Sequence, residues 1–143
     1  MKTIRQVLES KGSDVITIRA AGTVYEALEL MAASNVGALI VVEEDRMVGI
    51  VSERDYARKV ILQGASSLKL QVRSIMSKDV CCATSKMTID ECMNLITENR
   101  CRHLPVIDED RLVGVVSIGD LVKTTLEEKE QLIKQLENYI KAG

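Results

Sequence analysis

The stretch that decides the fold is VGIVSERD, residues 48–55, because it returns as VGVVSIGD at residues 113–120. Both copies are Gly-x-x-Ser-x-x-Asp elements, set 65 positions apart. When the chain is aligned on itself with that shift, residues 23–58 match residues 88–123 without a gap, and thirteen of the 36 aligned positions are identical. Self-similarity over this length predicts a duplicated supersecondary unit that packs on its copy.

A helix begins each aligned segment. Thr23-x-x-Glu26 and Thr88-x-x-Glu91 have the spacing of capping boxes, which satisfy free amides at a helix start. Apolar residues then recur at helical spacing in both copies, which predicts one buried face on each helix. These faces comprise Val24, Ala27, Leu28 and Met31 in the first copy and Ile89, Cys92, Met93 and Ile96 in the second.

Short apolar stretches rich in Val and Ile surround each helix and predict strands. They are DVITI (14–18), ALIVV (38–42) and MVGIVS (47–52), then DVCCA (79–83), LPVI (104–107) and LVGVVS (112–117). The polar turns EEDR and DEDR join the last two of each set into a hairpin, and a further helix is expected near Ser52 and Ser117. The predicted fold class is α/β (α+β): two tandem β-α-β-β-α units packed sheet to sheet with pseudo-two-fold symmetry, plus a C-terminal helix.

We expect the first domain, with a short N-terminal helix, at 1–65 and the second at 66–124, followed by a terminal helix at 125–143. In that last segment Leu126, Ile133 and Ile140 lie seven residues apart, flanked by Leu132, Leu136 and Tyr139. This apolar stripe must pack on the protein's own body, on a second copy or in a partner's groove.

Composition excludes several classes of protein. Of the 143 residues 46% are hydrophobic and 28% are charged, and the net charge of −2 favours neither nucleic acid nor a membrane surface. The scarcity of aromatic residues, 2% of the chain, removes the stacking platforms of single-strand binders. No apolar run approaches a membrane span, and the first residues lack a signal-peptide core, so we expect a cytoplasmic protein.

The four cysteines are Cys81, Cys82, Cys92 and Cys101, and no two have CxxC spacing. With one histidine, His103, a zinc site of ordinary spacing is difficult to assemble, and no metal is expected. Buried, unreactive thiols are the simple interpretation. A redox role for the adjacent pair Cys81 and Cys82 is the alternative.

The repeated Ser-x-x-Asp element has two interpretations. Ser52 and Ser117 can cap helices while Asp55 and Asp120 lie in the first turn, where the helix dipole favours an acid. The same geometry can bind a nucleotide, because free amides at a helix start attract phosphate and a carboxylate accepts hydrogen bonds from a ribose. The duplication of the whole element favours ligand binding.

The repeated unit resembles the cystathionine-β-synthase (CBS) domain. The resemblance covers roughly residues 3–123 and rests on TVYEALELMAASNVGALIVVEEDRMVGIVSERD and TIDECMNLITENRCRHLPVIDEDRLVGVVSIGD, in particular on RHLPV and the two VG[IV]VS..D segments. It implies a stand-alone pair of CBS domains that acts as a regulator of a separate protein and catalyses no reaction. It also implies a homodimer and clefts that bind an adenine nucleotide: AMP, ADP, ATP, S-adenosylmethionine or NAD.

The resemblance further implies which residues line two clefts. One cleft is expected to hold Val115, Ser117, Gly119 and Asp120 against Ile16, Thr17, Ile18 and Ala38. The other is expected to hold Ile50, Ser52, Arg54 and Asp55 against Cys82, Ala83, Arg102 and His103. In both, the aspartates take ribose hydroxyls and the serines and basic side chains take phosphate, with Arg102 and His103 able to serve either cleft.

The clefts differ, because Gly37 and Ala38 stand where the second copy has Arg102 and His103. We therefore expect different affinity or occupancy in the two. A structural dimerisation module with empty clefts is the main alternative function, and a thiol redox protein is the other. A role in transcription is not supported, since no basic recognition helix is present.

Overall fold

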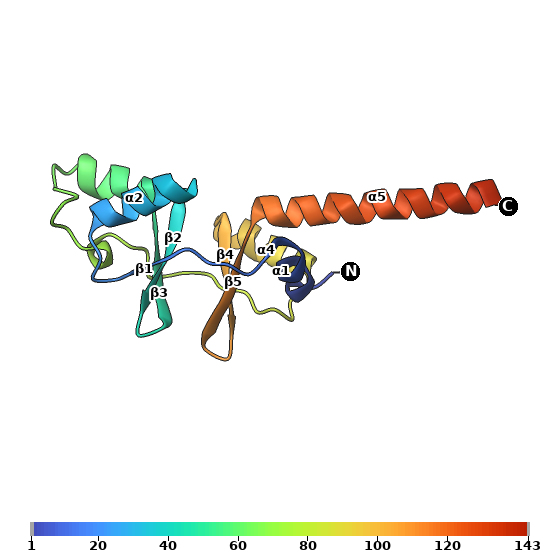
Figure 1. Ribbon diagram of the computed structural model, residues 1–143, viewed down its shortest axis with the longest axis horizontal. Helices are drawn as coiled ribbons and strands as arrows, with labels where there is room; N and C mark the ends of the chain where they lie inside the picture. The colour runs from blue at the N-terminus through green and yellow to red at the C-terminus, as the bar shows by residue number, and fades with distance from the viewer. Residues whose placement is uncertain (1, 143) are drawn as a thin grey trace. The chain divides into compact units, whose positions relative to one another are not determined.

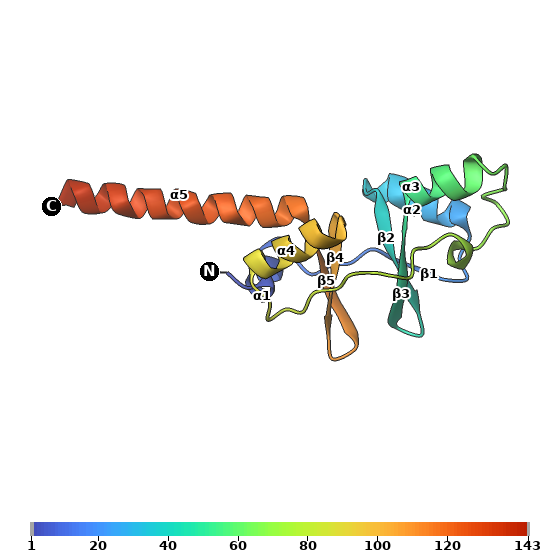
Figure 2. The ribbon, with the colours of Figure 1, turned by 180° about the vertical axis from the view of Figure 1, so that it is seen from behind.

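The computed structural model describes residues 2–142, which divide into two compact units. The first-repeat unit comprises 14–80 and 107–113, and the second-repeat unit comprises 2–13, 81–106 and 114–142. Each unit mixes helices with a small sheet, as the duplicated pattern predicts (Figures 1 and 2). No helix within residues 2–142 is both long and apolar enough to cross a membrane.

The first-repeat unit follows the predicted order of strand, helix, strand, strand and helix. Its elements are β1 (Thr17–Arg19), α2 (Val24–Ser34), β2 (Ala38–Glu43), β3 (Arg46–Ser52), α3 (Glu53–Tyr56), the π-helical turn η1 (Ala57–Ile61) and the 3-10 turn η2 (Val72–Ser74). The strands form a sheet in the order β1-β2-β3, with β1 parallel and β3 antiparallel to β2. The predicted cap at Thr23 is present, since its hydroxyl accepts a hydrogen bond from the Glu26 amide at 3.1 Å.

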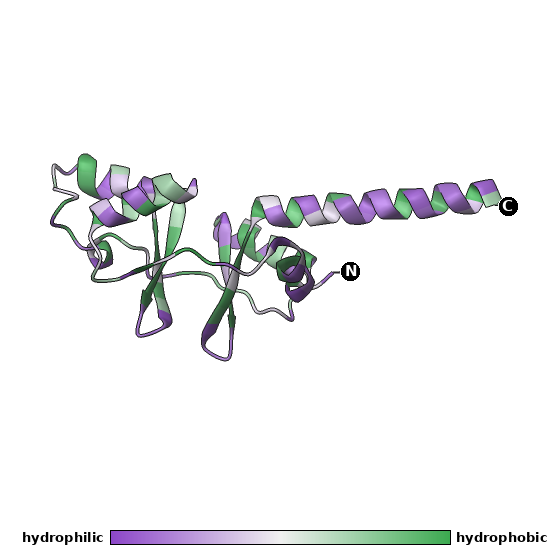
Figure 3. Ribbon diagram, in the orientation of Figure 1, coloured by the Kyte–Doolittle hydropathy of each residue, from purple (hydrophilic) through white to green (hydrophobic). Residues whose placement is uncertain are grey.

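The core of this unit consists of aliphatic side chains from α2 and the sheet. Leu39, Val41 and Val51 come from the strands, and Val24 and Met31 come from the predicted apolar face of α2. Figure 3 shows the hydrophobic strands against polar hairpin turns. Burial of each such side chain stabilises the fold by roughly 1.5–3 kcal/mol. The core is therefore built from aliphatic residues in a chain that has no Phe and no Trp.

The second-repeat unit contains α4 (Ile89–Asn99), α5 (Ile118–Ala142), the N-terminal helix α1 (Ile4–Lys11) and most of the strands β4 (His103–Asp108) and β5 (Arg111–Ser117). The turn of that hairpin, with the adjoining ends of both strands, falls in the segment 107–113. The chain before α1 runs beside residues 85–88: the Ile4 amide donates to Met87 O at 2.8 Å, and Thr3 pairs with Thr88. The predicted hairpin of β4 and β5 is present. As in the first hairpin, its two turn residues have left-handed backbone, Glu109 with φ 49° and Asp110 with φ 65°.

One predicted strand is missing from this unit. Of DVCCA (79–83), only Ala83 pairs with β4, through a single parallel bridge to Val106. In the first-repeat unit the Ile40 amide donates to Ile16 O, but the residue 65 positions after Ile40 is Pro105, which has no amide hydrogen. The hydrogen bond that would extend the ladder therefore cannot form.

The end of the chain is one long helix. The helix expected near Ser117 and the terminal helix expected at 125–143 are joined without a break in α5, which has no Pro and no Gly after Gly119 up to Ala142. Leu121 and Thr124 bury the first part of α5 in its unit, whereas every residue from 129 to 142 is exposed. Figures 1 and 2 both show this second half extending away from the rest of the second-repeat unit.

The repeated glycines tolerate a side chain to different degrees. A Cβ at Gly49 would lie 2.7 Å from Ser77 O, a backbone atom, whereas one at Gly114 would lie 2.7 Å from a methyl carbon of the Leu8 side chain. We predict that Gly49→Ala lowers the free energy of unfolding by about 2 kcal/mol or more and Gly114→Ala by less, because a side chain can rotate away. Chemical denaturation of both variants measures this, and an equal or larger loss for Gly114→Ala would contradict it.

Candidate functional site

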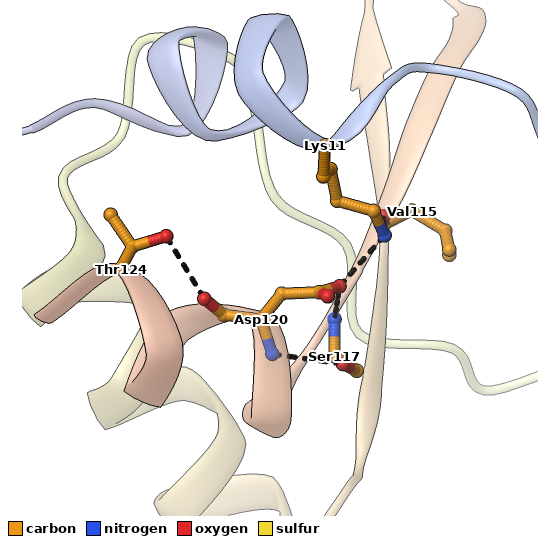
Figure 4. Close-up of polar contacts among 5 residues, drawn as sticks. All are labelled: Lys11, Val115, Ser117, Asp120 and Thr124. Atoms are coloured by element: carbon orange, nitrogen blue, oxygen red, sulfur yellow. Dashed lines mark hydrogen bonds and ion pairs between the residues drawn. The ribbon is translucent and has the colours of Figure 1, made fainter. Parts of the chain in front are cut away.

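The junction of β5 and α5 is built around a reciprocal pair of hydrogen bonds. The Ser117 amide donates to Asp120 Oδ2 at 2.8 Å, and the Asp120 amide donates to Ser117 Oγ at 3.1 Å (Figure 4). This is the capping geometry that the Ser-x-x-Asp spacing predicts. It starts α5 and fixes the carboxylate beside the first turn, where backbone amides have no acceptor within the helix.

A cation from α1 completes this cluster. Lys11 Nζ lies 2.7 Å from Asp120 Oδ2 and donates to Val115 O at 2.8 Å (Figure 4). Lys11 and the Ser117 amide therefore use both lone pairs of Oδ2. The Asp120 side chain is 26% exposed and both of these bonds go to Oδ2, so Oδ1 is the carboxylate oxygen better placed to accept a hydrogen bond from a ligand.

The charges around Asp120 favour an anionic ligand. Burial raises the pKa of Asp120, but hydrogen bonds from Lys11 and Ser117 and the charge of Lys11 outweigh it and hold that pKa below its usual value. The pKa of the neighbouring His103 is lowered, chiefly because partial burial disfavours the charged imidazole. The charge of Asp120 opposes this change, and the charges of Lys11 and Arg102 add to it. At neutral pH two cations, Lys11 and Arg102, thus accompany one carboxylate.

The junction of β3 and α3 repeats the box with a different outcome. The Ser52 amide and hydroxyl both donate to Asp55 Oδ2, at 2.9 and 3.0 Å, and the Asp55 amide donates back to Ser52 Oγ. Lys59 Nζ lies 3.4 Å from Asp55 Oδ1 and donates to Ile75 O. Both carboxylate oxygens of Asp55 are thus engaged, whereas Thr124 replaces Lys59 in the second copy.

The predicted cleft residues are distributed over both units, and Ile16, Cys82, Ala83 and Arg102 lie outside the strands. Ala38 pairs with Ser52 across β2 and β3, and Thr17 and Ile18 on β1 pair with Ile40 and Val41. The remaining residues of the first-repeat unit are Ile16, Ile50 and Arg54, and those of the second-repeat unit are Cys82, Ala83, Arg102, His103, Val115, Ser117, Gly119 and Asp120.

Inside the second-repeat unit the structure brings residues of both predicted sets together. The Ile118 amide donates to Arg102 O, which links the start of β4 to the start of α5, and His103 is close enough to feel the charge of Asp120. The sequence interpretation had assigned Arg102 and His103 chiefly to the cleft of Asp55. The two complete clefts draw residues from both units, and they stay predictions.

Sequence reasoning missed Lys11. The position 65 residues later is Met76, so no repeat marks Lys11, and a basic residue in the last turn of a helix is an ordinary C-terminal feature. Lys59 has the sequence context of a solvated residue on a helix face. The i,i+4 spacing of Asp55 and Lys59 is a signal that could have identified Lys59, whereas no sequence signal marks the ion pair of Lys11 with Asp120.

The thiols provide little support for redox chemistry. Burial raises the pKa of Cys82, and burial with the charge of Glu91 raises the pKa of Cys92 to about 11. The raised pKa of Cys82 and Cys92 disfavours their thiolates, and the thiolate is the reactive species. Within residues 2–142 no group of three or more His, Cys, Asp or Glu side chains could hold a metal ion.

Comparison with known families agrees with the repeat. The family model of the CBS domain matches residues 4–61 and 72–127, one match for each copy. The chain belongs to the CBS-domain family. The CBS-domain match thus includes both Ser-x-x-Asp boxes and both hairpins.

Similar CBS-domain proteins share most of their length with this one. "CBS domain-containing protein CBSX3, mitochondrial" from Arabidopsis thaliana is 39% identical over 150 residues, covering 99% of this chain and 73% of that protein. A solved protein with CBS domains from Burkholderia ambifaria MC40-6 is 46% identical with a TM-score of 0.83, covering 88% of this chain and 95% of that chain. The CBS domain pair of protein MJ0100, solved with 5-methylthioadenosine and S-adenosyl-L-methionine, has a TM-score of 0.77 at 23% identity, covering 90% and 98%, and shares the fold.

The ion pair of Lys11 and Asp120 has a testable effect on stability. We predict that Lys11→Met lowers the free energy of unfolding at neutral pH by about 1 kcal/mol, because a partly buried carboxylate loses its cation. Since the pKa of Asp120 is lowered in the folded protein, its contribution is present above the ordinary aspartate pKa and is lost as the pH falls through the lowered value. The difference between variant and wild type should shrink over that acidic range.

Urea denaturation at a series of pH values measures this effect. Lys86→Met, which removes a cation from an exposed position of the same unit, is the matched control and should change little. Equal stability of Lys11→Met and wild type at neutral pH would show that the ion pair contributes nothing.

Proposed function

We propose that this protein is a regulatory module that binds an adenine nucleotide next to Asp120 and acts on a separate protein. The observation that carries the proposal is the partly exposed Asp120 carboxylate, whose hydrogen bonds from Lys11 and the Ser117 amide both go to Oδ2, so that Oδ1 is the acceptor offered to a ligand, with the cation Lys11 beside it. A carboxylate beside a cation and the start of a helix suits a ligand that combines hydroxyl donors with a phosphate.

Each part of the nucleotide has a partner in this proposal. A ribose hydroxyl donates to Asp120 Oδ1, and the phosphate lies against the first turn of α5, near Gly119, with Lys11 or Arg102 as its cation. The adenine is received by the segment of the first-repeat unit that the CBS-domain resemblance assigns to this cleft. That segment comprises Ile16, Thr17, Ile18 and Ala38.

The second site, at Asp55, is proposed to bind more weakly. Lys59 and Ser52 engage both oxygens of Asp55, so a ribose must displace the ammonium before it can bind. The loss of that ion pair subtracts from the binding free energy. The other residues proposed for this site are Ile50, Arg54, Cys82, Ala83, Arg102 and His103.

The comparisons support binding of an adenosine-containing ligand, because a CBS domain pair with the same fold was solved with two such molecules. AMP, ATP and NAD are the candidates, the functional state is proposed to be a homodimer, and the proposal involves binding without a chemical reaction. The cytoplasmic location stays a prediction, since the Arabidopsis relative is described as mitochondrial.

The proposal predicts which aspartate matters. A ligand at 100 times its dissociation constant adds roughly 2.7 kcal/mol to the free energy of unfolding, which raises the melting temperature visibly. We expect such a rise with AMP, ATP or NAD, its loss in Asp120→Asn, and a smaller change in Asp55→Asn. Thermal unfolding with each nucleotide, with NADH and with S-adenosylmethionine, measured as the rise over each variant's own ligand-free value, tests this.

Matched controls come from the hairpin turns. Asp110→Asn and Asp45→Asn remove the same charge from turn positions with left-handed backbone, which Asn adopts readily. Both controls should keep the full ligand-dependent rise. If no adenine nucleotide raises the melting temperature of the wild type, the Ser-x-x-Asp boxes only cap helices, and the structural dimerisation alternative is favoured.

A further inference from the structure

The second half of α5 exposes a continuous apolar stripe. Its members recur at alternating spacings of four and three residues, which is the spacing of the contact positions in a coiled coil. Each residue is between 42% and 79% exposed. They are Val122 (42% exposed), Leu126 (55%), Ile133 (54%), Leu136 (54%) and Ile140 (76%), with Leu132 (55%) and Tyr139 (79%) along one edge. Lys129 is the single charged residue at a seam position.

This stripe needs a partner for a physical reason. Most helical stability in proteins comes from packing of an apolar face, and residues 129–142 are all exposed in the single chain. Figure 3 shows apolar and polar bands alternating along this part of α5. An apolar seam of this length with charged residues at its flanks is suited to pairing with another helix of the same kind.

We propose that α5 pairs with α5 of a second copy of this chain, antiparallel and centred on Gln131. In a parallel pair, Lys129 would oppose Lys129 of the second copy inside the seam, and no flanking position would meet an opposite charge. In the antiparallel pair Lys129 lies opposite Ile133 instead, where its alkyl stem packs and its ammonium reaches water.

The charge pattern also selects the register. Centring on Gln131 places Val122 opposite Ile140 and Leu126 opposite Leu136, so the whole stripe lies within the overlap. On the flank, Lys123 of each copy then meets Glu137 of the other, giving two ion pairs by symmetry. Neither side chain takes part in an ion pair described within residues 2–142.

Other registers fit less well. If the centre of the pair is moved one heptad toward the C-terminus, Glu130 of each copy lies next to Glu137 of the other. This register contains two repulsive pairs and leaves Lys123 without a partner. In the proposed register the one repulsive pair is Glu130 with Glu130 of the second copy, at the two-fold axis. Lys134, four residues farther along the same helix, offsets that repulsion.

Charge reversal tests the pairing in the full-length protein. We expect sedimentation equilibrium to show self-association of the wild type, and Lys123→Glu or Glu137→Lys alone to weaken it by roughly tenfold, since each turns two attractive pairs into repulsive ones. The double variant should return to within about threefold of the wild type. Lys86→Glu and Glu98→Lys make the same charge changes at exposed positions outside α5 and should have little effect.

Three outcomes would overturn the proposal. They are a wild type that stays monomeric at every concentration, a double variant that associates no better than the single ones, and control variants that weaken association as much as the α5 variants. Because residues 129–142 are exposed in the single chain, Glu137→Lys should leave its melting temperature at low concentration unchanged, which separates loss of pairing from loss of folding.

A photo-crosslink tests the direction of the pair. With p-benzoylphenylalanine in place of Ile140, we expect a link to the region of Val122 in a second copy, identified as intermolecular by mixing isotope-labelled and unlabelled protein. The same group in place of Asn138, on the opposite side of α5, should give no intermolecular link. A link from 140 to 140 would show a parallel pair, and a link within one chain would show that the stripe packs on its own protein; either would overturn the proposal.

Discussion

The reciprocal hydrogen bonds between Ser and Asp at the two strand-to-helix junctions are the interaction on which the site depends. In each copy the box ends a strand, starts a helix and holds a carboxylate beside the first helical turn. The capping and ligand-binding interpretations are therefore not exclusive, because the bonds that cap the helix also orient the carboxylate. What distinguishes a cap from a site is whether an oxygen of that carboxylate remains free.

By that criterion the two copies have diverged through their lysines. Lys59 lies in the same helical segment as its aspartate, so its ion pair forms wherever that segment folds. Lys11 comes from α1, more than a hundred residues away from Asp120 in sequence. It donates to Asp120 Oδ2, the oxygen that also accepts from the Ser117 amide, and not to Oδ1. The duplication thus preserves the box and alters its surroundings, and the proposed function attributes different affinities to the two sites for that reason.

Much of this was predictable from the sequence, because helices, hairpins and caps depend on local patterns that the repeat presents twice. The failures have local physical causes. DVCCA does not form a strand because Pro105 lacks the amide that Ile40 uses, and α5 continues past 125 because no residue there stops it. Lys11 was missed because its partner is distant in sequence, and the single free oxygen of Asp120 follows from hydrogen-bond geometry that no spacing encodes.

The measurement that most directly tests the account is an NMR titration of the isotope-labelled full-length protein with AMP, following the backbone amide signals. The account predicts that the largest shifts fall on Ser117, Gly119 and Asp120, with smaller and later shifts on Ser52 and Asp55. Saturable shifts elsewhere in the chain, with the signals of the β5–α5 junction unchanged, would contradict it.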